Sequence, residues 1–209
     1  MSYPIVNYKE AGAFLLSAVR ARIPVLLVGS PGVGKTALVR AVAKQVNLPS
    51  HELIGSTCDP TDVAGIPWVR PGATGKAPST LERAPLARIQ ACADGPGLLF
   101  LDELSCAPPS VQAALLRLVL DYAAGDVALH PDSRIVAACN PPEPAPGGFE
   151  LSSPLVGRLT IATLAPTLDE VRAFFRDVLA GGDAHPAAGF ATEFRRLALD
   201  WSATSEVEP

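Results

Sequence analysis

The stretch from Val28 to Arg40, VGSPGVGKTALVR, holds residues whose types and spacing indicate phosphate chemistry. Its pattern GxxxxGK[ST] is formed by Gly29, Ser30, Pro31, Gly32, Val33, Gly34, Lys35 and Thr36. Glycines lack a Cβ atom, so the loop can turn its backbone N–H groups around phosphate oxygens at a helix N-terminus that already favours an anion. Lys35 would then reach the β- and γ-phosphates of ATP, and the Thr36 hydroxyl would ligate Mg²⁺. We therefore predict a nucleotide-binding loop rather than a glycine-rich turn with a chance lysine.

The segment GLLFLDE and the later AACNPPE supply a second set of candidate residues. Asp102 follows a predicted buried strand, where a carboxylate can hold Mg²⁺ through water. Glu103 comes directly after it and can polarise a water molecule for attack on the γ-phosphate, unless it is a solvated loop charge. Asn140 follows another predicted strand and could hold the same water or the γ-phosphate, although an asparagine before proline is more often a turn residue.

Alternating strand and helix patterns predict the elements that position these residues. Asn7 and Glu10 form a capping box for the first helix, and Val25 to Val28 is a continuous apolar run typical of a strand buried on both faces. We predict strands over 25–28, 51–56, 98–101, 127–129, 135–138 and 159–164, and helices over 8–20, 35–48, 86–93, from 109 onward and 167–180. In the helix after the loop, Leu38, Val42 and Val46 would face the core. This alternation indicates the α/β class, with a largely parallel sheet sandwiched by helices.

Composition restricts the class of protein. The net charge is −4 and the pI about 5.4, so no overall cationic field draws the chain to nucleic acid or anionic lipid. The four cysteines are widely spaced without a CxxC pair, which favours reduced, buried thiols over a zinc site or a disulfide scaffold. The apolar stretches are too short for a membrane span, and we predict a cytoplasmic protein without a membrane partner. The isolated histidines, His51, His130 and His185, are predicted to have surface or structural roles.

The order of the motifs resembles that of the AAA+ ATPases of the MoxR type, whose fold is a P-loop NTPase core. The resemblance covers about residues 7–164 and is carried by GSPGVGKT, CDPTDVAGIP, APLARI, LLFLDELSCAPPSVQAALL, AACNPPE and ELSSPLVGRL. It implies a nucleotide-binding core over 1–165, with a hairpin inserted around 58–80, and a short or truncated helical lid over 166–209. In that lid we find no convincing second sensor arginine, because Arg195 and Arg196 fit exposed helix charges better.

The resemblance also implies a ring. The inserted hairpin would face the central pore, with Gly65, Trp68 and Val69 in or near it, although core packing is an equal alternative for Trp68. Arg158 aligns with the family's arginine that completes the neighbouring subunit's site. A guanidinium suits that role because it stays charged and can hold two phosphate oxygens. Leu159 departs from the phenylalanine that usually follows this arginine in the family.

The implied function is ATP hydrolysis, to ADP and phosphate, by a chaperone-like motor that forms a homo-oligomer, a hexameric ring, and that remodels or activates a client or adaptor protein. Family members often work with a protein bearing a von Willebrand factor A domain. Two alternatives are a nucleotide-gated binding subunit with little turnover, which the missing sensor arginine favours, and a DNA-directed motor, which the acidic charge opposes. A small-molecule P-loop kinase would have little use for the insertion or for Arg158.

Overall fold

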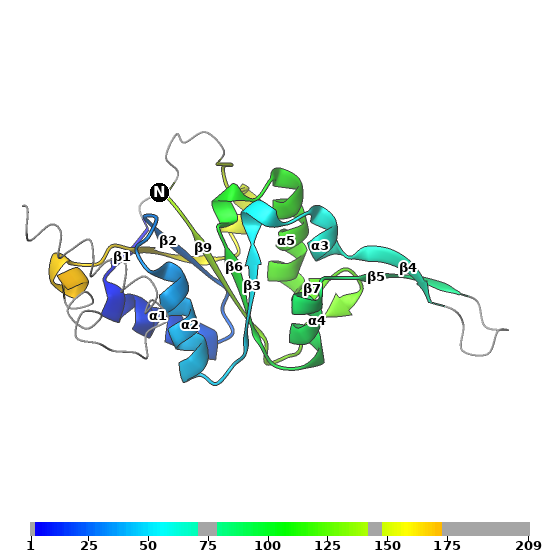
Figure 1. Cartoon of the computed structure of the whole chain (residues 1–209), viewed down its shortest axis with the longest axis horizontal. Coiled ribbons are helices and arrows are strands. Elements are labelled where there is room, and N and C mark those ends of the chain that lie inside the picture. The colour runs from blue at the N-terminus through cyan, green and yellow to red at the C-terminus, as the bar shows by residue number, and fades with distance from the viewer. Residues whose placement is uncertain (1–2, 71–78, 142–147, 173–209) are drawn as a thin grey trace, which may run out of the picture. The chain divides into compact units, whose positions relative to one another are not determined.

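The structure is a computed structural model that describes residues 3–70, 79–141 and 148–172 (Figure 1). The chain divides into two compact units, Met1–Ala165 and Pro166–Pro209. The first unit contains the sheet and its helices. In the second, Thr167 and Glu170 cap a helical turn, because the Glu170 N–H donates to Thr167 Oγ1 at 3.2 Å. The rest of the helix predicted to Ala180, and Arg195, Arg196 and His185, lie outside the described residues.

A six-stranded sheet forms the centre of the first unit. Its strands are β1 (Ile5–Val6), β2 (Val25–Gly29), β3 (Ser50–Ile54), β6 (Leu98–Asp102), β9 (Arg134–Cys139) and β10 (Thr160–Leu164). They lie in the order β1-β10-β2-β9-β6-β3, and each neighbouring pair is parallel. Parallel strands need crossover connections, which place helices on both faces. The predicted α/β class with a parallel sheet is therefore confirmed.

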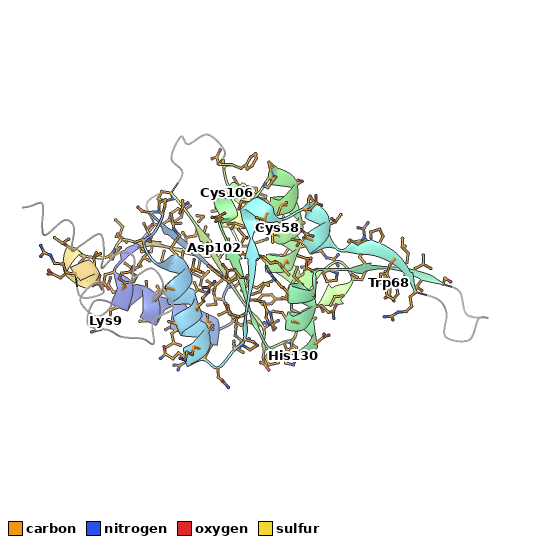
Figure 2. All side chains as sticks on the ribbon, in the orientation of Figure 1. Lys9, Cys58, Trp68, Asp102, Cys106 and His130 are labelled. Atoms are coloured by element: carbon orange, nitrogen blue, oxygen red, sulfur yellow. The ribbon has the colours of Figure 1, made fainter. Side chains whose placement is uncertain are left out.

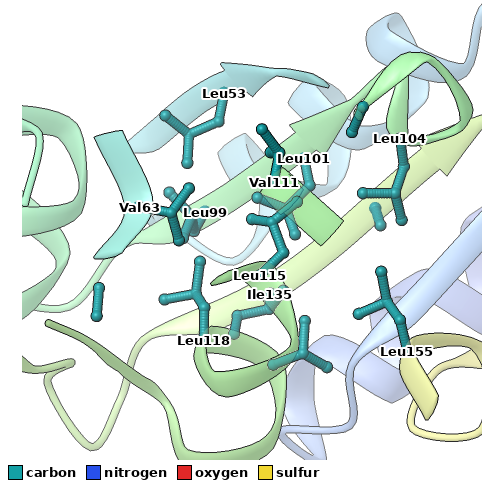
Figure 3. Packing of buried hydrophobic residues seen from close by; sticks show 14 of the residues in the cluster. Leu53, Val63, Leu99, Leu101, Leu104, Val111, Leu115, Leu118, Ile135 and Leu155 are labelled. Carbon is teal, nitrogen blue, oxygen red and sulfur yellow. The ribbon is translucent and has the colours of Figure 1, made fainter. Parts of the chain in front are cut away.

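Helices cover both faces of the sheet. They are α1 (Tyr8–Arg20), α2 (Lys35–Gln45), α3 (Pro60–Ala64), α4 (Ala87–Asp94), α5 (Pro109–Asp121) and α6 (Ser153–Val156), with short 3₁₀ turns η1 (Gly55–Thr57) and η2 (Leu104–Cys106). Residues of α1 and α2 share one hydrophobic cluster with Leu27 and Phe100. Residues of α3, α4, α5 and α6 share the other with Leu26 and Leu99 (Figure 3). Successive strand residues alternate between the two clusters, as the pleat of a strand requires.

Several elements differ from the sequence prediction. The buried face of α2 is Val39, Val42 and Ala43, while Leu38 and Val46 are only half-buried. The predicted strand at 127–129 is β8 (Val127–Ala128), which pairs with β7 (Ala123–Ala124) in a separate two-stranded sheet. The two-residue β1 and the five-residue α3 are too short to produce a periodic signal.

The inserted segment contains an antiparallel hairpin of β4 (Ile66–Arg70) and β5 (Thr80–Ala84). Trp68 is 44% exposed and Val69 59% exposed, which excludes packing in the core for either. Figure 2 shows Trp68 on this hairpin, apart from Asp102 at the end of the sheet. Arg70 lies over the Trp68 ring and also pairs with Glu82 at 3.2 Å.

The base of the hairpin is fixed against the turn between β7 and β8. The Arg83 N–H donates to Asp126 Oδ2 at 2.8 Å, which ties β5 to that turn. Gly65 and Gly125 both have positive φ, and a Cβ atom on either would lie 3.0 Å or less from Arg83 backbone or side-chain atoms. Glycine is therefore required at both positions for this close approach.

The four cysteines are free. Cys92 and Cys139 are buried, and burial raises the pKa of each thiol to about 11. Cys58 and Cys106 are only half-buried, so the expectation of buried thiols is correct for two of the four. Within residues 3–70, 79–141 and 148–172, no helix has both the length and the apolar character that crossing a bilayer would require.

Candidate active site

The loop between β2 and α2 presents backbone N–H groups at a helix N-terminus. Gly32 has φ 74° and Gly34, the N-cap of α2, has φ 90°, which are conformations that glycine adopts without a steric penalty. Within the described residues, the backbone N–H groups of Gly34, Lys35 and Thr36 donate to no hydrogen-bond acceptor. Unsatisfied N–H groups at the first turn of a helix bind anions, so the loop fits a phosphate group.

The Lys35 ammonium group lies beneath this loop with three acceptors around it. Nζ donates to Gly29 O at 2.6 Å, to Ser30 O at 3.0 Å and to Asn140 Oδ1 at 2.8 Å. These bonds use all three donors of the group. Burial lowers the pKa of Lys35, while attraction to Asp102 and Cys139 acts in the opposite direction. Lys35 and Asn140, predicted from separate motifs, thus meet at the ends of β2 and β9.

Thr36 and Asp102 form the second contact of the site. The Thr36 hydroxyl donates to Asp102 Oδ2 at 2.7 Å, which joins the start of α2 to the end of β6. A hydroxyl and a carboxylate are hard oxygen ligands of the kind Mg²⁺ prefers when substrate phosphates and water complete its shell. The two side chains therefore fit the predicted magnesium site.

Glu103 follows Asp102 in a left-handed conformation, with φ 53°. Its carboxylate accepts a hydrogen bond from Ser56 Oγ, and its backbone N–H donates to Asp102 Oδ1 at 2.8 Å. Sequence reasoning missed Ser56, although Ile54 of β3 lies opposite Asp102 of β6. Neighbouring parallel strands end at the same edge, so a polar residue after β3 can be identified as a partner for Glu103 only once the strand order is known.

Tyr8 is a second residue that sequence reasoning missed. Its hydroxyl donates to the Val33 carbonyl and so ties the first turn of α1 to the phosphate loop. A Cβ atom at position 34 would lie 2.7 Å from the Tyr8 hydroxyl oxygen. Gly34 is required by its backbone conformation, and a larger residue there would also displace the Tyr8 hydroxyl.

Arg158 does not join the other predicted site residues. Its side chain is exposed, and its Nη1 donates to Pro154 O at 2.8 Å. Within the described part of the chain, no carboxylate forms an ion pair with it. Leu159, its neighbour, is 8% exposed and packs in the hydrophobic cluster beneath α5. The backbone therefore turns Leu159 inward and leaves the Arg158 guanidinium at the surface.

Replacing Lys35 by alanine is expected to weaken ATP affinity by about 10-fold or more, at roughly 1.4 kcal/mol per decade. The reason is that the Lys35 ammonium group is bonded to the loop backbone at Gly29 O and Ser30 O, and alanine removes this positive charge beside the phosphates. Titration with a fluorescent ATP analogue measures the change. Lys44→Ala is the matched control, because Lys44 lies exposed in the last turn of the same helix. Unchanged affinity in the Lys35 variant would remove the phosphate-loop assignment.

Comparison with known proteins finds relatives that match parts of this chain. It is 35% identical over 151 residues to ATPase family gene 2 protein homolog B of Homo sapiens, covering 65% of this chain and 18% of that protein. It is 34% identical over 119 residues to Protein MoxR of Methylorubrum extorquens, covering 56% of this chain and 32% of MoxR. The chain thus spans a third or less of the length of these relatives.

A solved structure and a family model complete the comparison. NtrX from Brucella abortus, solved in complex with ADP, superposes with a TM-score of 0.56 at 18% identity over 80% of this chain and 38% of NtrX, which shows the fold. The family model described as AAA domain (dynein-related subfamily) matches residues 24–159, a span that includes the phosphate loop, Asp102, Glu103, Asn140 and Arg158. The chain therefore belongs to the AAA domain family, in its dynein-related subfamily.

Proposed function

We propose that this chain hydrolyses ATP at the interfaces of a homo-oligomeric ring and uses the energy to remodel or activate a protein partner. The proposal rests on one observation, which is that the predicted site residues lie in two separate places on the chain. Lys35, Asn140, Thr36 and Asp102 converge beside the loop, whereas Arg158 is exposed on the same chain. An exposed arginine whose guanidinium, within the described residues, hydrogen-bonds only a carbonyl of its own chain can reach the pocket of a neighbouring copy. Such a head-to-tail contact closes into a ring when its rotation allows.

The phosphates of ATP would lie against the N–H groups at the start of α2. All three donors of Lys35 are in use, so a phosphate oxygen must replace one of its present acceptors. Asn140 Oδ1 is the acceptor on a side chain that can move, and its release would free the Asn140 amide to contact the γ-phosphate or the attacking water. Thr36 and Asp102 would hold Mg²⁺. When bound, this ion would reduce the repulsion between the negatively charged phosphates and the incoming nucleophile.

Glu103 would act as the general base. Its carboxylate takes a proton from a water molecule while the water oxygen attacks the γ-phosphorus, and the bond from that phosphorus to the bridging oxygen of ADP breaks. The Ser56 hydroxyl, which donates to the carboxylate, restricts its orientation. Arg158 of the adjacent copy would hold the equatorial oxygens as negative charge develops on them.

The partner is proposed to be a client or adaptor protein, and a protein with a von Willebrand factor A domain is the form that the MoxR resemblance suggests. The exposed hairpin supports contact with a polypeptide, because Trp68, Val69 and Leu81 leave 44%, 59% and 69% of their surfaces open. The net charge of −4 supports a protein partner over DNA.

Mass measurement with and without ATP, together with phosphate release over a series of protein concentrations, tests this function. The expected result is a ring-sized mass, six copies by the family resemblance, and turnover per subunit that rises as the ring assembles. Assembly on ATP without phosphate release would instead show a nucleotide-gated binding subunit. Turnover that requires added duplex DNA would show a DNA-directed motor, and constant turnover by a monomer would refute the interface site.

A further inference from the structure

Gln112 is a buried polar residue with no part in the chemistry described above. In the described part of the chain, the polar or charged residues that are buried are Lys35, Gln112 and Ser133. Gln112 lies near the start of α5 and is 1% exposed. Burying an amide is unfavourable unless its donors and acceptor are all bonded, so its hydrogen bonds indicate what it holds in place.

The Gln112 amide bonds three backbone groups from two segments. Nε2 donates to Ala107 O at 3.0 Å and to Glu150 O at 3.2 Å, and Oε1 accepts from the Ser152 N–H at 2.8 Å. Both N–H donors and the carbonyl oxygen are therefore engaged. Two of the three bonds go to the segment 150–152, which is distant from Gln112 in the sequence and leads directly into α6.

Ser152 passes this constraint on to α6. It is the N-cap of the helix, and its carbonyl accepts from the Leu155 and Val156 N–H groups, each at 3.0 Å. The Arg158 N–H donates to Leu155 O at 3.1 Å, and its guanidinium donates to Pro154 O at 2.8 Å. A helix of four residues has little stability of its own, so its direction depends on what anchors it. Its anchors include the buried Leu155 and the amide of Gln112.

The bond to Ala107 offers a different reading, in which Gln112 would support Glu103 through η2. That turn has other supports. The Cys106 N–H donates to Glu103 O at 2.8 Å, the Ala107 N–H donates to Leu104 O at 3.2 Å, and Ala107 itself is fully buried. The neighbouring Phe149 N–H donates to Ser105 O of η2 at 2.8 Å, but within the described residues the backbone hydrogen bonds of 150–152, apart from those of the Ser152 carbonyl into α6, go to Gln112. The loss of Gln112 is therefore expected to affect this segment more than η2.

We propose that Gln112 is a positioning residue that sets the direction of α6 and thereby presents Arg158 to the neighbouring subunit. The proposal rests on the proposed function of Arg158 at a subunit interface. The Gln112 side chain forms no hydrogen bond with Lys35, Thr36 or Asp102 within the described residues, so its loss is expected to leave the ATP pocket of its own subunit intact. Loss of Gln112 is therefore expected to lower ATP turnover because the Arg158 side chain no longer points toward the neighbouring subunit.

The test assigns Gln112 to one of two complementation groups. Gln112→Met keeps the length of the side chain and removes its hydrogen bonds. It is expected to lower kcat by about 10-fold or more, where each factor of ten corresponds to about 1.4 kcal/mol of activation free energy. ATP affinity should stay unchanged in this variant. Mixed with Glu103→Gln subunits, which carry a sound arginine, it should recover activity, because its pocket then meets that arginine. Mixed with Arg158→Ala subunits it should recover none, because neither partner supplies one.

Each outcome of these mixtures decides a separate point. Recovery with Arg158→Ala but not with Glu103→Gln would assign Gln112 to Glu103, and recovery with neither would show general misfolding; both overturn the proposal. If Glu103→Gln and Arg158→Ala fail to complement each other, the interface function itself fails. Gln90→Met is the matched control, because the Gln90 side chain donates to Asp94 Oδ1 on its own helix at 2.8 Å. Should Gln112→Met not fold, Ser152→Pro replaces it in the same mixtures, because proline removes the N–H that donates to Gln112 Oε1 and fits the φ of −62° at this position.

Discussion

Replacing Arg158 by alanine is expected to lower ATP turnover by about 10³–10⁵-fold, the range that an arginine supplied in trans contributes. ATP affinity should stay unchanged, because Arg158 contacts Pro154 O on its own chain and none of the described pocket residues. Arg158→Lys keeps the charge but loses the planar pair of donors, so it should recover little. Phosphate release and ATP titration on the same samples measure the two effects.

Mixing distinguishes action in trans from action within one subunit. Arg158→Ala subunits keep Lys35, Asp102 and Glu103, whereas Glu103→Gln subunits keep the arginine. A mixed ring contains interfaces where both halves are sound, so two inactive variants should recover part of the activity. Arg117→Ala is the control, because that exposed arginine is paired with Asp121 on its own helix at 3.9 Å. No recovery in mixtures shown to exchange subunits, together with an earlier melting transition, would make Arg158 a structural residue.

Replacing Glu103 by glutamine is expected to lower turnover by about 10²-fold or more, the size typical of a positioned general base. Glutamine has nearly the same shape and can still accept the Ser56 hydrogen bond, but it cannot take the proton of the attacking water. Lys35, Thr36 and Asp102 are unchanged, so ATP and Mg²⁺ should still bind and the oligomer should remain in its ATP form. Chromatography of the bound nucleotide, after the time that the wild type needs for one turnover, should find ATP rather than ADP.

The control for this variant is Glu52→Gln, because Glu52 pairs with Arg40 at 2.6 Å on the surface and lies in β3 rather than at its end. It should hydrolyse ATP at the wild-type rate. If Glu103→Gln did the same, Glu103 would be no more than a loop charge.

Local patterns were sufficient to predict the elements that carry the site. The capping box of Asn7 and Glu10 predicted the start of α1, and both of its hydrogen bonds are present. Continuous apolar runs predicted β2 and β6, because strands covered on both faces have no polar side. Phosphate and Mg²⁺ binding require particular residue types at particular positions of a motif. Lys35 and Asp102 could therefore be identified without knowledge of the strand order.

Contacts between distant segments could not be predicted in the same way. Tyr8 and Val33 are separated by 25 residues, and Ser56 and Glu103 by 47, and no spacing rule links either pair. The hydrogen bonds of the Gln112 side chain likewise could not be predicted, because its partner Ser152 is 40 residues away in the sequence. For α3, by contrast, Asp59 and Asp62 form a capping box that was present in the sequence, and the surrounding turn residues obscured it.

The place of β2 in the sheet has a consequence for how the protein is made. Its partners, β9 and β10, pair Val136 and Thr160 with Val25 and so come from much later in the chain. At ordinary rates of translation, on the order of ten seconds pass between the synthesis of β2 and that of β10. During this time the apolar strand that precedes the phosphate loop has open edges, which favour pairing with other nascent chains. The nascent polypeptide thus passes through an interval of aggregation risk, which ends when Leu164 leaves the ribosome.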